Sequence, residues 1–149
     1  MILPKPIPMI SAHVSLADAC ASQTAEREGI ANVPRAEDIA RMKIVAAECY
    51  EPLWRSAGGA IRISSFYRSP ALNSKVGGSK TSQHMLGAAF DVIATGKMTN
   101  AKLLQLARVL PSFDQCISEF GPSEENPAWV HVSFISREKN RKMYFRIGK

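Results

Sequence analysis

The stretch Ser82-Gln83-His84-Met85-Leu86-Gly87-Ala88-Ala89-Phe90-Asp91 places an imidazole and a carboxylate seven residues apart. A loop rich in glycine, serine and threonine precedes the histidine, and the aspartate falls in a segment that reads as a strand. Alternation along residues 87–94 sets Asp91 on the face opposite to the apolar Phe90 and Val92. We therefore expect Asp91 to point towards a site rather than into an apolar core.

Histidine and aspartate both suit Zn²⁺, which binds nitrogen and oxygen ligands at about 2.0–2.2 Å in a roughly tetrahedral shell. Two ligands do not make a site, so a third is expected elsewhere in the chain. The best candidate is His131, in Ala128-Trp129-Val130-His131-Val132-Ser133-Phe134. There the valines and Phe134 form one face of a predicted strand, while Trp129, His131 and Ser133 share the other.

Two further segments accompany this pattern, and their order along the chain matters. Phe66-Tyr67-Arg68-Ser69-Pro70 precedes the SxHxxGxAxD pattern of residues 82–91, and Trp129-Val130-His131-Val132-Ser133-Phe134 follows it. From about Ser15 to Phe134 the chain resembles the zinc D-alanyl-D-alanine carboxypeptidase and L-alanyl-D-glutamate endopeptidase family. Many single-domain phage endolysins belong to that family, and the hedgehog signalling domain shares its fold. The resemblance implies an α+β fold with a small, mainly antiparallel sheet and helices packed on one side.

By the same resemblance, His84, Asp91 and His131 would hold one zinc ion per chain. Three protein ligands leave a fourth position for water, which is typical of catalytic zinc. A carboxylate must then take the proton of that water, and Glu119 is our choice. Several family members carry this acid three residues before the last histidine, where this chain has Ala128. The rival carboxylates are Glu124, Glu125 and Asp114.

Two residues are expected to bind substrate. In the family, an arginine at the position of Arg68 recognises a carboxylate near the scissile bond, and a guanidinium can do so bidentately. A serine at the position of Ser82 assists. The alternatives are a loop arginine that makes surface ion pairs, and a serine that only fixes its loop through local hydrogen bonds.

These residues together predict a zinc metallopeptidase that acts on peptidoglycan stem peptides, in the manner of a phage endolysin. The bond remains open: D-Ala–D-Ala, L-Ala–D-Glu or a cross-bridge. One alternative is a catalytically silent zinc domain that serves as a cell-wall or protein interaction module. Another is a binder of anionic polymers such as nucleic acid, although no specific nucleic-acid motif is present.

Composition is consistent with one globular domain spanning residues 1–149, with a mainly helical part (1–56) and a sheet that carries the metal site (57–149). No apolar run approaches the roughly 18 residues of a membrane span, and residues 1–8 lack the apolar core of a secretory signal. We expect a monomer made in the cytoplasm that reaches the cell wall or periplasm after holin-type release, or as part of a virion. The three cysteines are expected to be buried, reduced thiols.

The positive charge is concentrated at the C-terminal end. Residues 137–149 hold six basic residues against Glu138, a net of +5 out of the chain's +6. Such a tail could be weakly attracted to an anionic envelope. The alternative is a solvated terminal strand whose lysines protect its edge.

The remaining elements follow from caps and periodicity. We expect a helix over residues 15–28 that breaks near Ser22, and a second that begins after Pro34 and kinks or ends at Pro52. Strands are expected over 60–66, 113–120 and 129–135, and a helix capped by Thr99. Residues 67–83 show no periodicity and are expected to form a structureless loop. His13 is expected at or near the surface, without a ligand role.

Overall fold

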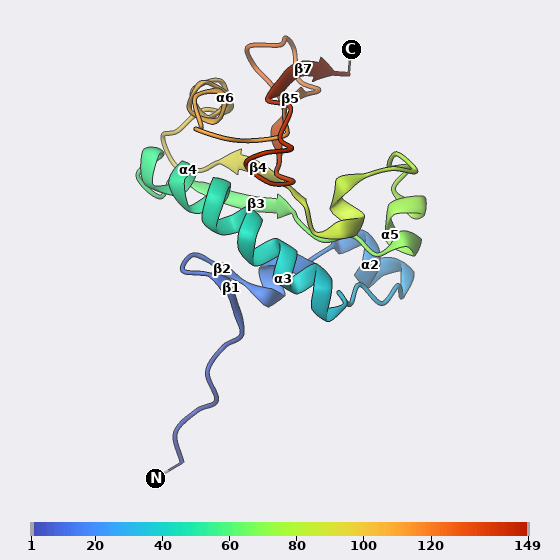
Figure 1. Cartoon of the computed structure of the whole chain (residues 1–149). Helices are drawn as coiled ribbons and strands as arrows, with labels where there is room; N and C mark the ends of the chain where they lie inside the picture. The colour runs from blue at the N-terminus through green and yellow to red at the C-terminus, as the bar shows by residue number, and fades with distance from the viewer. Residues whose placement is uncertain (1, 149) are drawn as a thin grey trace.

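A five-stranded mixed sheet forms the centre of the molecule in the computed structural model, which describes residues 2–148 (Figure 1). Its strand order is β3-β4-β6-β5-β7. The bounds are β3 (Ile61–Ser65), β4 (Ala89–Ala94), β6 (Trp129–Ser133), β5 (Gln115–Glu119) and β7 (Met143–Ile147). Neighbours are antiparallel except β5 and β7, which run parallel. The expected α+β class with a mainly antiparallel sheet is confirmed, and the parallel edge strand is an addition to it.

The N-terminal region begins with a hairpin that the sequence did not predict. β1 (Met9–Ser11) pairs with β2 (Val14–Ser15), and α1 (Leu16–Cys20) and α2 (Gln23–Glu28) follow. Ser15 and Ser22 each accept a backbone N–H at the start of a helix, so the predicted break near Ser22 is confirmed. His13 stacks on Trp54 and lies 2.6 Å from a Glu51 carboxylate oxygen, which ties the hairpin to the long helix described next.

That long helix runs from Ala36 to Ser56 in three parts: α3 (Ala36–Val45), the π-helical η1 (Ala46–Tyr50) and α4 (Glu51–Ser56). Pro52 does not end it, contrary to one of the two expectations. Proline lacks the N–H that an α-helical turn requires. The helix widens to a π-turn just before it, with the Glu51 N–H bonded to the Ala46 carbonyl, and then continues.

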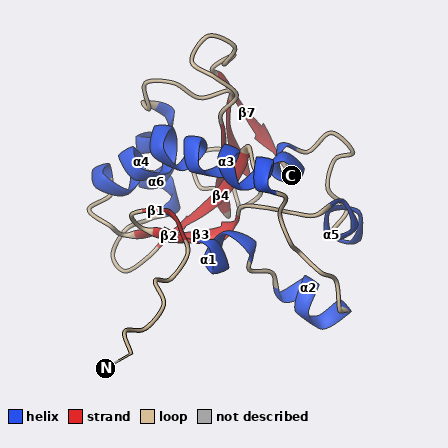
Figure 2. Cartoon of the chain, turned by 60° about the horizontal axis from the view of Figure 1, so that its bottom comes forward, coloured by secondary structure: helices blue, strands red, loops and turns tan. Residues whose placement is uncertain are grey.

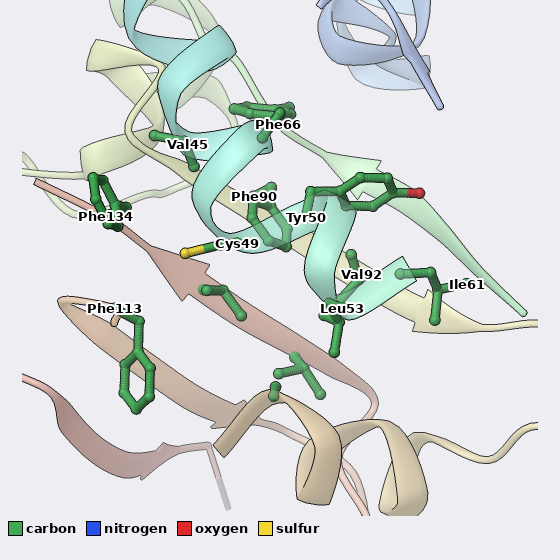
Figure 3. Close-up of a cluster of buried hydrophobic side chains, with 14 of the residues drawn as sticks. Val45, Cys49, Tyr50, Leu53, Ile61, Phe66, Phe90, Val92, Phe113 and Phe134 are labelled. Atoms are coloured by element: carbon green, nitrogen blue, oxygen red, sulfur yellow. The ribbon is translucent and has the colours of Figure 1, made fainter. Parts of the chain in front are cut away.

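The apolar face of this helix packs on the sheet, as Figure 3 shows for Val45, Cys49, Tyr50 and Leu53. Met42, Ala46, Cys49 and Leu53 are fully buried and form the apolar stripe of this helix. Tyr50 meets Phe90 edge to face, with ring centroids 5.5 Å apart. The helix α6 (Asn100–Arg108), capped by Thr99 as predicted, covers the same sheet face through Leu103 and Ala107. Because these helices occupy one face of the sheet, the other face remains available for a site.

The prediction of a structureless loop at residues 67–83 was wrong. α5 (Pro70–Lys75) lies within it, and the 3₁₀ turn η2 (Gln83–Leu86) closes it. Ser69 caps α5 by accepting the Leu72 N–H, and Pro70 occupies the first turn, where proline loses no hydrogen bond. Figure 2 shows α5 and α2 set apart from α3, α4 and α6, on the flank of the sheet.

The open face of the sheet presents two rows of side chains. Cross-strand pairing places Asp91, His131, Ile117 and Phe145 in one row. The adjacent row on the same face holds Trp129, Glu119 and Ile147. Side chains alternate along a strand, so the buried Val130, Val132, Cys116 and Phe90 point the other way, into the core. The predicted division of β4 and β6 into two faces is confirmed.

The basic C-terminal segment is largely part of the folded body within the described residues, since residues 143–147 form β7. Arg141 pairs with Asp114 and Arg137 with Glu48. Lys149, part of the predicted tail, lies outside the described residues. All three cysteines are free, as predicted, although Cys20 is only partly buried. None of the helices in residues 2–148 combines the length and apolar character that crossing a bilayer requires.

Candidate metal centre

His84, Asp91 and His131 meet on the open face of the sheet, as predicted. All three are buried, and one ligand atom from each lies within 4.8 Å of those of the other two. His84 comes from η2, while Asp91 and His131 are directly paired neighbours on β4 and β6. Asp91 Oδ1 is the common point, 3.2 Å from His84 Nε2 and 3.0 Å from His131 Nδ1. We call these residues the metal triad.

The hydrogen bonds of His84 determine which of its nitrogens faces the triad. Its Nδ1 lies 2.7 Å from the Phe66 carbonyl oxygen, which can only accept, so Nδ1 carries a proton. A neutral imidazole then presents a lone pair at Nε2, directed at the lone pairs of a carboxylate oxygen 3.2 Å away. That contact is favourable only with a second ring proton or with a cation between the two atoms. A backbone carbonyl that orients the far nitrogen is common for metal-bound histidine.

The dimensions of the triad suit a zinc ion. Ligands at 2.0–2.1 Å from a tetrahedral zinc lie about 3.3 Å apart, from the geometry of the tetrahedron. The two distances to Asp91 Oδ1, 3.2 and 3.0 Å, are close to this spacing. Two imidazole nitrogens and one carboxylate oxygen are also the donor types that zinc binds in catalytic sites. The three residues of the metal triad therefore fit a zinc ion.

Asp91 is held in its charged form. Burial on its own would raise the pKa of this carboxyl group, but the two imidazoles outweigh burial through charge and hydrogen bonding, and the pKa of Asp91 is lowered. Arg68 contributes a further ion pair, with Nη2 3.7 Å from Asp91 Oδ2. A permanently ionised carboxylate suits a metal ligand, because binding then requires no loss of a proton at that group.

Arg68 reaches the triad from the β3 side of the sheet and is only partly exposed. Its backbone N–H donates to the His84 carbonyl, and its Nη1 donates to Asn73 Oδ1 at 3.2 Å. Asn73 is itself buried and donates to the Ser79 carbonyl. Gly78 is required there, since a Cβ at this residue would lie 2.1 Å from Asn73 Oδ1. The loop thus fixes the guanidinium beside Asp91.

Ser82 and Gln83 form the other wall near His84. Ser82 Oγ accepts the His84 N–H at 3.3 Å, the local bond that the sequence left as an alternative to substrate binding. Gln83 Nε2 donates to Asp114 Oδ2, and Arg141 makes a forked ion pair with the same carboxylate. Asp114, one of the rival bases, is fully buried in these contacts.

Glu119 lies in the neighbouring row of the open face, one strand beyond β6. The Trp129 Nε1–H donates to its Oε2. Burial raises the pKa of Glu119, and the negative charge of Asp91 raises it further, against the lowering effect of His131 and of the Trp129 bond. Among the rivals, Glu125 is exposed, and Glu124 bonds to Tyr144.

A cleft of about 940 Å³ contains these groups. Its lining includes His84, His131, Glu119, Arg68 and Ser82, all predicted from sequence, and none of the three rival carboxylates. The structure thus brings every predicted site residue to one place, with Asp91 directly behind the two histidines. A cleft with convergent polar groups and a shifted carboxyl pKa is typical of an active site.

Several residues that shape the site were not predicted. Asn32 donates to the Cys20 and Tyr67 carbonyls and accepts the Ser69 N–H, which holds the Arg68 segment in place. The contacts of Asn73 and of the Phe66 carbonyl were not predicted either. The Ser69-Pro70 pair was the readable signal, since serine followed by proline favours a helix start and hence an ordered loop. Nothing in the sequence pointed to Asn32.

Comparison with known proteins agrees with this geometry. A search of curated proteins finds no match. A family profile described as Peptidase M15 matches residues 12–133, most of the chain, and the match includes Arg68, the whole metal triad and Glu119. Peptidases of this family are zinc-dependent, and the α+β architecture is that of the hedgehog/DD-peptidase fold. The chain belongs to the Peptidase M15 family.

Proposed function

We propose that this protein is a zinc-dependent peptidase of peptidoglycan that hydrolyses a stem-peptide or cross-link bond. One observation carries the proposal. Two buried imidazoles converge on one carboxylate oxygen at 3.0 and 3.2 Å, and His84 donates its Nδ1–H to the Phe66 carbonyl, so that Nε2 is the nitrogen that faces the carboxylate. Membership of a metallopeptidase family supports the same conclusion.

His84, Asp91 and His131 would hold one zinc ion. A zinc ion bound there would polarise the scissile carbonyl as a Lewis acid and would lower the pKa of its bound water to about 7. The chain supplies the remaining functions. Burial of the triad against the sheet excludes bulk water from its inner side and fixes the ligands before substrate arrives.

Glu119 acts as the general base and then as the acid that protonates the leaving amine. Its Oε2 is held by Trp129, so Oε1 is the oxygen that takes the proton. Its raised pKa brings it closer to the range in which a carboxyl group both accepts and returns a proton. The contacts of Asp114 and the exposure of Glu125 favour Glu119 over these rivals.

Arg68 and Ser82 bind substrate at the cleft wall. Arg68 holds a carboxylate or the polarised carbonyl oxygen near the scissile bond, and its bond to Asn73 aims the guanidinium. Ser82 keeps its hydroxyl at the cleft while it supports the His84 backbone. Both roles are carried over to Arg68 and Ser82 from the corresponding residues of the family.

We further propose an endolysin-type role at the cell wall, with release through a holin-type pore or delivery in a virion. The basic residues near the C-terminus would add weak attraction to an anionic envelope. A zinc domain that binds without cutting is the alternative, and the placement of Glu119 in the cleft argues against it.

Purified sacculi provide the test. Zinc-loaded protein should release soluble fragments, chelation should stop the release, and added zinc should restore it. Zinc-loaded protein that binds sacculi but releases nothing would leave the silent domain as the better description.

A further inference from the structure

We propose that the apolar side chains of edge strand β7 form a subsite for the part of the substrate that leaves as the amine. The subsite consists of Phe145 and Ile147 of β7, with Phe120 at the end of β5. It makes the enzyme an endopeptidase, which cuts where the chain continues beyond the scissile bond, rather than a carboxypeptidase. This inference rests on the proposed peptidase function.

The register of the sheet places this subsite on the leaving-group side. Glu119 pairs with Trp129 on β6 and with Ile147 on β7, so it lies between the metal triad and the edge strand. The group that protonates the leaving amine must lie beside that amine. A substrate whose amine sits over Glu119 therefore continues towards β7, while its acyl part lies towards β3 and Arg68.

Distances within a sheet set the length of this extension. Neighbouring strands lie about 4.8 Å apart, so β7 is roughly 5 Å beyond Glu119 and roughly 10 Å beyond His131. One residue of an extended chain spans about 3.3 Å. The cleft floor therefore accommodates about two residues beyond the scissile bond before it reaches the far side of β7.

The chemistry of this floor does not suit a terminal carboxylate. Phe120, Phe145 and Ile147 all line the cleft, together with Ile117. Among residues 2–148, the basic residues that line the cleft are Arg68 and Arg141. Arg68 comes from the opposite side of the triad, and the Arg141 guanidinium is engaged by both oxygens of Asp114. An enzyme that releases a single terminal residue needs a cation about one residue past the scissile amine, and within residues 2–148 this part of the cleft offers none.

The backbone conformation at Phe120 holds its side chain at the apolar surface of the cleft. Its φ is +55°, a conformation that bulky residues rarely adopt and that recurs at functional sites. Its N–H donates to the Ile147 carbonyl, and its ring lies 5.1 Å from the Trp129 ring, centroid to centroid. Gly148 leaves the space that the ring needs, since a Cβ there would lie 2.7 Å from Phe120 Cδ1. Phe120 is nevertheless 45% exposed, so it is held in place with an apolar surface open to a ligand.

The direct test is the mass of the amine-side product. Zinc-loaded wild-type protein is incubated with two defined muropeptides, an uncross-linked pentapeptide monomer and a cross-linked dimer, and the fragments are identified by mass spectrometry. We expect every amine-side product to contain two or more residues. Free D-alanine as the main product, formed only in the presence of zinc, would overturn the inference while the proposed function stands. Absence of zinc-dependent cleavage from both substrates would overturn the proposed function and the inference with it.

A double variant, Phe145→Ala with Ile147→Ala, tests the residues. We expect kcat/KM on the cleaved muropeptide to fall at least tenfold, mainly through KM, and Phe145→Leu to recover most of the loss. Met143→Ala is the matched control, because Met143 lies on the same strand and face but outside the cleft lining. Zinc content and circular dichroism verify that each variant is folded. A double variant with the same kcat/KM and products as Met143→Ala would refute the subsite.

Discussion

Replacement of Glu119 by glutamine is the most informative single change, because it removes the proposed base and little else. Glutamine has nearly the same shape, and its Oε1 can still accept the Trp129 indole N–H that Glu119 accepts now. The metal triad contains no atom of Glu119. The change therefore isolates proton transfer from metal binding and from packing.

The expected loss follows from what a positioned base contributes. General base catalysis is worth about 10²–10⁴ in rate, which corresponds to roughly 3–5 kcal/mol of transition-state stabilisation at 1.36 kcal/mol per tenfold. We expect kcat for muropeptide cleavage to fall by that factor while KM changes less than threefold. A loss confined to kcat is typical of a group that acts in the transition state.

The assay measures release of soluble fragments from sacculi at saturating zinc, together with zinc content by elemental analysis. Glu125→Gln is the matched control, because Glu125 is an exposed carboxylate near the same strands and lies outside the cleft lining. Glu119→Gln that holds one zinc per chain and retains more than a tenth of wild-type turnover would refute the assignment of the base. The same measurement on Glu124→Gln and Asp114→Asn would then identify which rival performs the step.

The other predictions concern the metal, the arginine, pH and one glycine. Wild-type protein should bind one zinc ion per chain. His84→Ala and His131→Ala should lose this zinc, and His13→Ala should retain it. Free zinc at 100 times its Kd should stabilise the wild-type fold by about 2.7 kcal/mol in thermal unfolding. Arg68→Lys should raise KM about 10- to 100-fold, because lysine lacks the planar fork and hydrogen bonds to charged groups contribute about 1.5–3 kcal/mol; an unchanged KM would contradict its role. In metal-free protein the raised pKa of Glu119 means that stability falls as pH rises from the ordinary value of 4.5 through the folded value. Metal-free Glu119→Gln should therefore have a higher Tm than metal-free wild type at pH 7.5, and the difference in Tm should disappear near pH 4. A difference in Tm that does not depend on pH would contradict this prediction. Gly87→Ala should destabilise the fold by about 1–3 kcal/mol in denaturant unfolding. The reason is that Gly87 has φ +70° and that a Cβ there would lie 2.8 Å from the Asp38 carbonyl oxygen. Gly96→Ala is the control that separates backbone strain from the steric clash, because Gly96 also has a positive φ but a Cβ there would meet no atom within 4 Å.

The elements that sequence alone predicted are those governed by local rules. Thr99 caps its helix as expected, and Ser15 and Ser22 lie at the helix start and the helix break that were expected there, because an N-cap bond joins residues three apart. The faces of β4 and β6 follow from alternation, which sets Asp91 and His131 on the open face, while the full triad with His84 was predicted from the family resemblance. Pairing partners between distant strands leave no such local signal. The parallel placement of β7 beside β5 is therefore the largest feature that the sequence did not provide.

The ordered loop between β3 and the triad was missed for a different reason. Its order comes from side chains that satisfy backbone groups far away in sequence: Asn32 holds the Arg68 segment across 35 residues, and Asn73 links Arg68 to Ser79. Amide side chains of this kind leave no periodic signal in sequence, although they decide where the functional residues point.

This loop and the edge strand contribute differently to the site. The loop places Arg68 and His84 by hydrogen bonds that a single substitution breaks, so changes there should remove activity altogether. The β7 face adds apolar area without holding the triad, since the triad bonds involve β4, β6, η2 and the Phe66 carbonyl. Substitutions on β7 can therefore alter which bond is cut while the metal ligands keep their positions. This separation of chemistry from selectivity is the physical reason to look for specificity at Phe145 and Ile147, and for catalysis at Glu119.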